Sequence, residues 1–229
     1  ADSMKNVDGT DDDFLLDVDP KVRERIEHSS HRLHVNTAVR THMIDNLVRK
    51  AIEKKPNLVV VNLGCGLCHR FTRVDNGKIN WYDVDFKELV KFKSKYLKKY
   101  ISTERYQLMY TNIIEVQDWA PKLFNRHPDR PFLFIAEGAF NHLTETQLKY
   151  MFLTLTNMFP NSELMTRGVS ELVFNSIKAQ RDKEGAGFIS KQYRSVSNLD
   201  IRSVLPVKPK YQLHKYDPRI QLIGQHFDC

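Results

Sequence analysis

The chain has few of the features that mark secreted or membrane proteins. Its 229 residues include only three cysteines, which are too few for a disulfide scaffold and fit a reducing compartment. No apolar run approaches the roughly 20 residues that a transmembrane helix needs. The first residues are acidic, whereas a secretory signal is basic and then apolar. These absences predict a cytoplasmic protein that does not engage a membrane.

The composition predicts one globular domain that follows an acidic arm. Hydrophobic residues make up 41% of the chain and charged residues 28%, which is a balance typical of folded proteins. A chain of this length buries about 70% of its unfolded surface and needs no disulfide or metal to hold a core. We expect a flexible arm over residues 1–18 and a single domain over residues 19–229.

Charge is distributed unevenly along the chain. The net charge is +7, but residues 1–20 hold seven Asp and one Lys, which leaves a net charge of +13 on the remainder. A basic body favours an anionic partner. The six lysines between Lys87 and Lys99 are expected to form a solvated helix face. These lysines are not accompanied by the aromatic and glycine residues of an RNA-binding motif or by zinc-finger spacing, which argues against a nucleic-acid partner.

Apolar runs that alternate with amphipathic stretches predict an α/β fold. Continuous β-branched runs are typical of strands buried on both faces, whereas apolar residues spaced three and four apart predict helices. Strands are expected at 58–63, 79–84, 106–110, 131–136 and 163–166, and helices at 32–53, 86–100 and 145–159. A weaker signal suggests a helix at 168–184 and strands at 211–215 and 220–227. This alternation predicts a doubly wound, mostly parallel sheet with helices on both faces.

The first strand is followed at once by Gly64-Cys65-Gly66, and the second ends at Asp85. Glycines allow a ligand to approach the backbone closely, and a carboxylate about 20 residues on can accept the hydroxyl hydrogens of a ribose. An N-cap for the next helix is the alternative role for Asp85. Dinucleotide sites need a third glycine near the pyrophosphate, and His69 stands there instead. The loop therefore favours S-adenosylmethionine over a dinucleotide.

Three ordered blocks carry a resemblance to a known family. They are Val59 to Phe71, Asn76 to Asp85 and Phe134 to Glu145. Together they resemble the leucine carboxyl methyltransferase and polyketide O-methyltransferase family, which belongs to the class I S-adenosylmethionine-dependent methyltransferases. The resemblance implies a Rossmann-like fold and S-adenosylmethionine-dependent O-methylation of a carboxylate or hydroxyl on a small molecule or peptide end.

The resemblance also implies which residues contact the cofactor: Arg40, Gly64, Gly66, Asp85, Asn112, Ile113 and Glu137. Arg40 matches the arginine that pairs with the cofactor's carboxylate, and an arginine fork suits such a partner. Asn112 and Ile113 match the adenine contacts, although the family has an acid in place of Asn112. Glu137 matches an acid near the amino end of the cofactor and the methyl site.

The chain departs from the family pattern in the loop, where Cys68 replaces an acid. This departure motivates an alternative function, a non-catalytic cofactor- or anion-binding module that has kept the methyltransferase fold. For catalysis, a carboxylate acceptor needs no general base, whereas a hydroxyl does, and His142 is the candidate.

Other motifs are weaker. Cys65 to His69 matches a haem-attachment motif, a redox CxxC pair or part of a zinc site. We nevertheless expect both cysteines to serve only as small residues of the loop. His28, His31 and His34 could share a helical face, yet solvent-facing or cofactor-covering side chains are expected, so no metal site is predicted. The sequence contains neither a hydrolase elbow nor a Walker loop.

Overall fold

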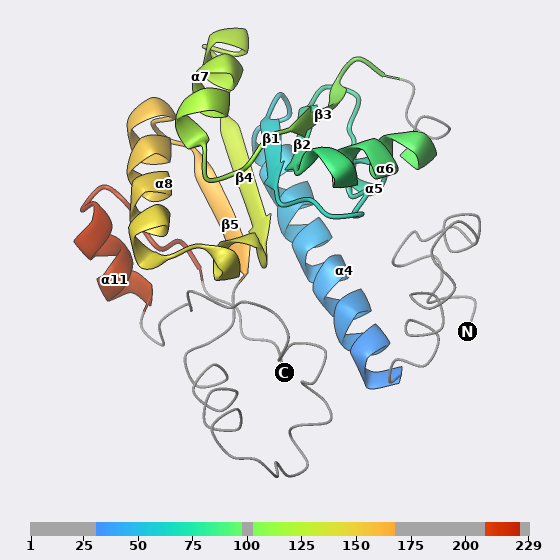
Figure 1. Cartoon of the computed structure of the whole chain (residues 1–229), viewed down its shortest axis with the longest axis horizontal. Coiled ribbons are helices and arrows are strands. Elements are labelled where there is room, and N and C mark those ends of the chain that lie inside the picture. The colour runs from blue at the N-terminus through green and yellow to red at the C-terminus, as the bar shows by residue number, and fades with distance from the viewer. Residues whose placement is uncertain (1–30, 98–102, 168–208, 225–229) are drawn as a thin grey trace.

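The computed structural model describes residues 31–97, 103–167 and 209–224. Its centre is a five-stranded parallel sheet of order β3-β2-β1-β4-β5 (Figure 1). The strands are β1 (Val59–Leu63), β2 (Asn80–Asp85), β3 (Tyr106–Tyr110), β4 (Phe132–Glu137) and β5 (Glu163–Arg167). The chain winds outward from β1 to β3, then crosses back and winds the other way through β4 and β5. The predicted doubly wound fold is confirmed.

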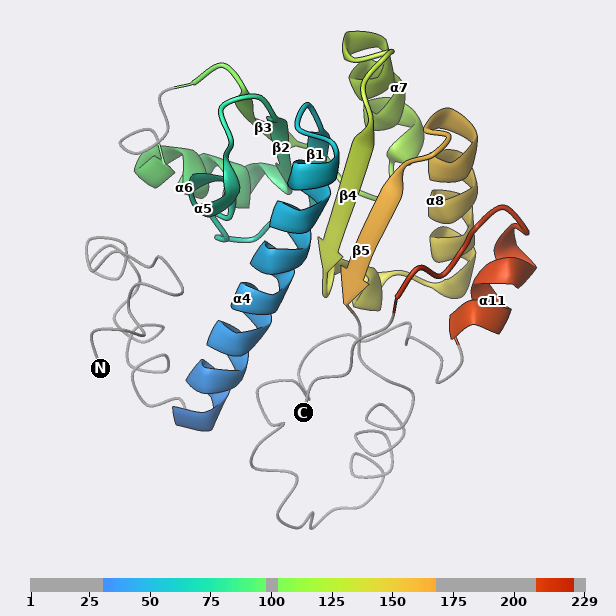
Figure 2. The same ribbon diagram turned by 180° about the vertical axis from the view of Figure 1, so that it is seen from behind.

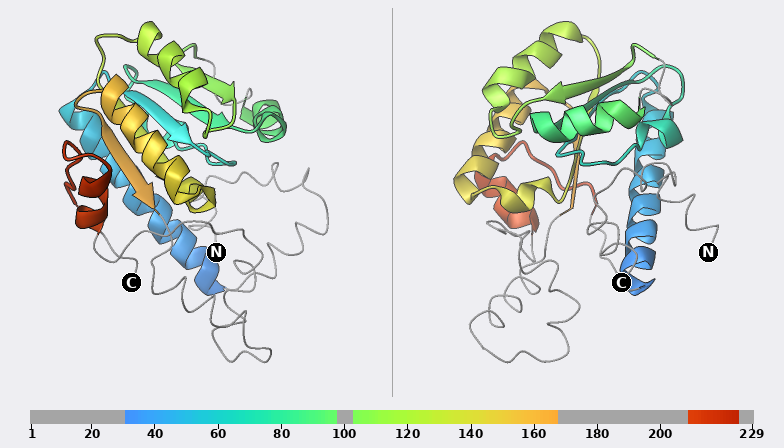
Figure 3. Two further views of the ribbon diagram at one scale, coloured as in Figure 1. Left: turned by 60° about the vertical axis from the view of Figure 1, so that its left-hand side comes forward. Right: turned by 45° about the vertical axis from the view of Figure 1, so that its right-hand side comes forward.

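Helices cover both faces of the sheet. The helices α4 (His31–Lys54), α5 (Phe71–Val74) and α6 (Lys87–Leu97) lie on one face. Figure 2 turns α4 toward the viewer. The other face is covered by α7 (Val116–Arg126) and α8 (Glu145–Met158), with α11 (Pro209–Tyr216) packed outside α8. Figure 3 shows the sheet between these two layers.

The strands form because their side chains alternate between two cores. Val59, Val61 and Leu63 of β1 point into the core beneath α7 and α8. Val60 points into the core beneath α4, where it meets Ile44, Val48 and other buried side chains. All five residues of β1 are buried. This two-sided burial is why a continuous apolar run, and not an alternating one, marks the strand.

Most predicted elements are confirmed with boundaries shifted by one or two residues. The capping box at Thr144 is present: its side chain accepts from the Gln147 amide, and the Gln147 side chain accepts from the Thr144 amide. Within α4, the described side chains Ile44, Val48 and Ala51 are buried. The expected helix at 86–100 is seen as α6 up to Leu97. The expected arm at 1–18 and helix at 168–184 lie outside the described residues.

The C-terminal prediction was wrong. Residues 211–215 belong to α11, and residues 220–224 form no strand. Tyr211 and Leu213 suggest a strand because they alternate, but Leu213 and Tyr216 are also spaced for one helical face. Both of these side chains pack against the core beneath α8, and the Tyr216 ring lies 5.9 Å from that of Phe152. Packing against the core therefore favours a helix over a strand in this segment.

α7 was not predicted at all. Pro121 lies inside it, and proline is strongly disfavoured in helix interiors. The helix forms because one face is apolar, with Val116, Trp119, Ala120 and Leu123 buried. The Trp119 indole also donates a 3.1 Å hydrogen bond to the Ile113 carbonyl, which fixes the helix to the loop after β3.

None of the helices in the described residues combines the length and the apolar character needed to span a bilayer. α4 has 24 residues, but its exposed side carries charged residues such as Lys50 and Glu53.

The turn after β1 depends on a glycine. Gly64 has φ +64°, and a Cβ placed there would lie 2.5 Å from the Cβ of Ala139. A side chain at this position would therefore meet both backbone strain and a steric clash. The turns that follow β1 and β4 can approach each other only because Gly64 lacks a side chain.

We predict that Gly64→Ala lowers the free energy of unfolding by about 2–4 kcal/mol, because overlap adds to backbone strain. Gly77→Ala is the matched control, since Gly77 also has positive φ but a Cβ placed there would meet no atom within 4 Å. It should cost only about 1 kcal/mol. Urea unfolding followed by circular dichroism measures both, and equal losses would contradict the role of Ala139.

Candidate active site

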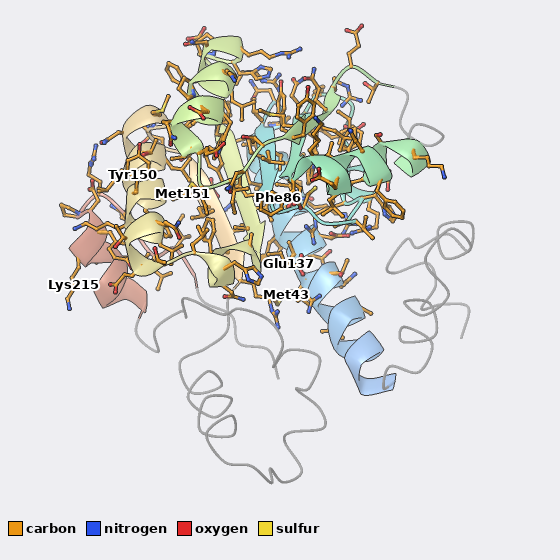
Figure 4. All side chains as sticks on the ribbon, viewed as in Figure 1. Met43, Phe86, Glu137, Tyr150, Met151 and Lys215 are labelled. Carbon is orange, nitrogen blue, oxygen red and sulfur yellow. The ribbon has the colours of Figure 1, made fainter. Side chains whose placement is uncertain are left out.

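The predicted site residues gather at the carboxyl ends of the strands. Ligands of doubly wound sheets bind at this edge, next to the point where the strand order reverses. Here that point lies between β1 and β4. Figure 4 labels Glu137 where β4 ends, near the stretch of α4 that carries Met43, and Phe86 on the side of α6.

Asp85 holds the glycine loop. Its Oδ2 accepts a 2.8 Å hydrogen bond from the Gly66 amide, and its Oδ1 accepts another, also 2.8 Å, from the Phe86 amide. The carboxylate is buried. Since α6 begins at Lys87, these bonds are not the N-cap bonds considered for Asp85, which would go to amides inside the first turn. Each oxygen keeps a further lone pair with which to accept a ligand hydroxyl.

Glu137 is held by two arginines from different elements. Arg40 of α4 donates from Nε to Oε1 at 2.6 Å, and Arg70, just before α5, donates from Nη2 to Oε2 at 3.0 Å. The Arg40 and Glu137 side chains are 27% and 20% exposed, so this end of the cluster is open to a ligand. The structure thus brings two predicted residues, Arg40 and Glu137, into direct contact.

The same cluster continues into the interior. Arg70 Nε donates to Asp45 Oδ1 at 2.6 Å, and Arg73 Nε donates to Asp45 Oδ2 at 2.6 Å. The Arg70 and Asp45 side chains are only 1% and 4% exposed. Charged hydrogen bonds in such a site are strong, and together they join α4, α5 and the end of β4. With three arginines and two carboxylates, the cluster carries a net positive charge.

Asn112 shapes the loop after β3. Its side-chain oxygen accepts a 3.2 Å hydrogen bond from the Ile114 amide, and the neighbouring Thr111 amide donates to the Asp85 carbonyl at 3.0 Å. Asn112 and Ile113 therefore lie at the same sheet edge as Asp85. The Asn112 oxygen already accepts one bond, and its second lone pair remains for an adenine amino group.

His142 ends the short helix η1 (Ala139–His142), which follows β4 through Gly138 at φ +81°. Its side chain is exposed. The residue therefore lies on the strand-end edge a few residues beyond Glu137, where an acceptor could reach it.

Two exposed aromatic residues at this edge were missed by the sequence analysis. Phe86 follows β2 and is 59% exposed, while Tyr110 ends β3 and is 67% exposed. Tyr110 pairs in register with Asp85, so both rings stand next to the proposed ribose acid. Their sequence signal is an aromatic residue at the end of a strand, where a solvated polar residue is more usual.

A second buried charge cluster, also missed, lies beneath the glycine loop. Asp83 Oδ1 accepts from Asn62 at 2.9 Å and from the Trp81 indole at 2.8 Å. Its Oδ2 accepts from Lys93 at 2.7 Å and from the Tyr106 hydroxyl at 2.5 Å. Every donor lies on a different element or strand position, so only the folded chain assembles the cluster.

The loop cysteines are thiols in different surroundings. Cys65 is buried, and burial together with the charge of Asp83 raises the pKa of its thiol. Cys68 is half-buried. Within residues 31–97, 103–167 and 209–224, no group of three or more His, Cys, Asp or Glu residues is arranged to hold a metal. His28 and the side chains of His31 and His34 lie outside what the structure describes.

Comparison with known proteins places the chain in a family. The leucine carboxyl methyltransferase model matches residues 5–156, well over half of the chain. The chain belongs to the leucine carboxyl methyltransferase family. The resemblance drawn from the sequence blocks is thereby confirmed.

One relative with an assigned role is the tetracenomycin polyketide synthesis O-methyltransferase TcmP of Streptomyces glaucescens. The two chains are 24% identical over 159 residues, which cover 69% of this chain and 56% of TcmP. The chain thus spans little more than half the length of this relative.

Solved structures agree on the fold. The plantazolicin methyltransferase BamL, solved with a triazolic desmethylPZN analog and SAH, matches with a TM-score of 0.54 and 12% identity over 94% of this chain and 71% of its own. The small RNA methyltransferase HEN1 matches with a TM-score of 0.52 and 16% identity over 76% of this chain and 21% of its own. Both support the class I methyltransferase fold and, at these identities, nothing finer.

We predict that Arg70→Met lowers the free energy of unfolding by about 3 kcal/mol or more, because it leaves Asp45 and Glu137 without their shared buried partner. Arg126→Met is the control, since Arg126 is exposed and donates to the Gln107 side chain. It should cost less than about 1 kcal/mol. Urea unfolding measures both variants. A loss for Arg70→Met no larger than that of the control would show that the cluster adds no stability.

The loop residue His69 makes stability depend on pH. Burial, and then the charge of Arg73, lowers the pKa of His69 below its ordinary value of 6.5. The unfolded chain then binds more protons than the folded chain as pH drops below about 6.5, so acid lowers stability. We predict that wild type loses more unfolding free energy between about pH 7.5 and about pH 5.5 than His69→Gln does. Identical losses in the two proteins would contradict this assignment.

Proposed function

We propose that the chain is an S-adenosylmethionine-dependent O-methyltransferase. The observation that carries the proposal is the pairing of Arg40 with Glu137 at the same sheet edge where Asp85 holds Gly66. β2, β1 and β4 are neighbours, so these two groups stand about 10 Å apart on strand spacing alone. Family membership supports the same function.

The residues fit the cofactor from end to end. Asp85 would accept the ribose hydroxyls, and the glycine loop would lie under the methionine chain. The methionine end carries one carboxylate and one ammonium group, and Arg40 and Glu137 offer one partner of opposite charge to each. Asn112, Ile113 and the rings of Phe86 and Tyr110 would receive the adenine. When bound, S-adenosylmethionine supplies an electrophilic methyl group.

We propose a small molecule or a peptide end as acceptor, with a carboxylate or hydroxyl oxygen as the nucleophile. The net charge of +13 outside the first 20 residues favours an anionic acceptor, and the name of TcmP supports a small molecule. A carboxylate attacks without losing a proton, so positioning supplies most of the catalysis. A hydroxyl must lose one, and His142 is the proposed base.

The low cysteine content further supports our proposal of a cytoplasmic, reducing location.

Calorimetric titration with S-adenosylmethionine and S-adenosylhomocysteine tests the proposal. We predict binding that Asp85→Ala weakens tenfold or more, about 1.4 kcal/mol, because the ribose loses its carboxylate partner. Asp118→Ala is the control, since Asp118 is exposed in the first turn of α7, on the other face of the sheet. It should leave binding unchanged.

If neither ligand binds to wild type, the proposed function is wrong for this chain. If Asp118→Ala weakens binding as much as Asp85→Ala does, general loss of negative charge explains the effect, and Asp85 is not the ribose acid.

A further inference from the structure

Lys93 is a buried cation that reaches the glycine loop. It lies on α6 and is only 2% exposed. Its ammonium group donates to the backbone carbonyl of Cys68 and, at 2.7 Å, to Asp83 Oδ2. Burial is the largest single influence and lowers the pKa of Lys93, but the charge and hydrogen bond of Asp83, together with the neighbouring cysteines, raise it above its ordinary value. The side chain is therefore charged at neutral pH.

The contact with Cys68 holds the far end of the loop. At the near end, the Gly64 amide donates to the Val84 carbonyl at 2.8 Å and the Gly66 amide donates to Asp85 at 2.8 Å. In the middle, the Cys68 amide closes a turn onto the Cys65 carbonyl at 3.2 Å. Lys93 fixes the peptide group that follows this turn, directly before Arg70 enters the cluster with Glu137. This hydrogen bond ties the loop to α6.

Asp83 alone does not need Lys93 for its hydrogen bonds. Asn62, Trp81 and Tyr106 already donate three bonds to its two oxygens. Burying an ammonium group is costly unless it is fully paired, so an apolar residue at position 93 would serve packing equally well. What an apolar residue cannot do is donate to the loop carbonyl. Neutralising Asp83 and holding the loop are thus separable roles.

We propose that Lys93 is a positioning residue for the cofactor loop, residues 64–68, and acts through its bond to the Cys68 carbonyl. The inference rests on the proposed function, because it assigns the loop to cofactor binding. Lys93 touches no reacting atom. It orders the backbone on which the methionine part of the cofactor would lie, so that binding does not have to order the loop.

A pair of double variants separates the two roles. Lys93→Met with Asp83→Asn removes both buried charges and the loop donor, whereas Lys93→Gln with Asp83→Asn removes the charges but keeps an amide donor. In both, the new amide at position 83 can accept from Trp81 and Asn62 through its oxygen and donate to the Tyr106 hydroxyl. Lys91→Met, on an exposed position of the same helix, controls for the loss of one positive charge.

We predict that both double variants unfold near the wild-type urea midpoint, because neither leaves a buried charge unpaired. The variant with Lys93→Met and Asp83→Asn (the Met pair) should bind S-adenosylhomocysteine tenfold or more weakly than wild type. The variant with Lys93→Gln and Asp83→Asn (the Gln pair) should recover at least half of that loss on a logarithmic scale. Hydrogen exchange at residues 64–69 should be faster in the Met pair than in the Gln pair. Lys91→Met should match wild type in all three measurements.

Equal affinity and equal loop exchange in the Met and Gln pairs would overturn the proposal while leaving the proposed function intact. If wild type does not bind S-adenosylhomocysteine, the proposed function fails, and the exchange rates alone decide whether Lys93 orders the loop. Should the Met pair not fold while the Gln pair does, Lys93→Leu with Asp83→Asn takes the place of the Met pair. Weaker binding and faster loop exchange than in the Gln pair support the donor role, and equal values contradict it.

Discussion

The carboxyl edge of the sheet depends on the buried pairing of Arg70 with Asp45 and Glu137. Arg70 is almost fully enclosed, and its guanidinium is the only group seen to join these two carboxylates among the described residues. Without it, two acids from α4 and β4 would face a low-dielectric interior with one partner fewer each. Together with the apolar contacts of α4, this pairing holds the stretch of the helix that carries Arg40 against the end of β4.

The central strands β1 and β4 were predictable because each is a short apolar run. The strands β2, β3 and β5 give a weaker pattern, but they too end where the ligand edge begins. Gly64, Asp85 and Glu137 stand at such ends, so their convergence follows from strand direction alone. α7 and α11 were not predictable in the same way. In α7, Pro121 argues locally against a helix, and in α11 the alternation of Tyr211 and Leu213 argues for a strand. Both segments are helical because of their packing against the apolar core.

The charge clusters beneath the edge lie beyond what a single sequence can indicate. Arg70 and Asp45 are 25 residues apart, and Lys93 looks like one of six lysines on a solvated helix. Nothing local distinguishes it from Lys91, which is exposed. The partner of a buried charge is set by tertiary packing, whereas a strand-end residue is set by local pattern. Apart from Arg40 on α4, the predicted site residues therefore lie at strand ends or in the segments that follow them. The missed residues are the exposed rings of Phe86 and Tyr110 at the same edge and the buried charges beneath it.

The two faces of the sheet differ in what they bury. Beneath α7 and α8 the core is mostly apolar, while beneath α4 and α6 the apolar core is bordered by Asp83, Lys93, Asp45 and Arg70. An apolar face accepts single exchanges among similar side chains. A face of paired charges accepts only substitutions that change both partners together, because a single substitution leaves the other charge buried and unpaired. In sequences that evolve from this one, residues beneath α7 and α8 should be replaced one at a time, whereas the charged residues beneath α4 and α6 should be replaced together with their partners.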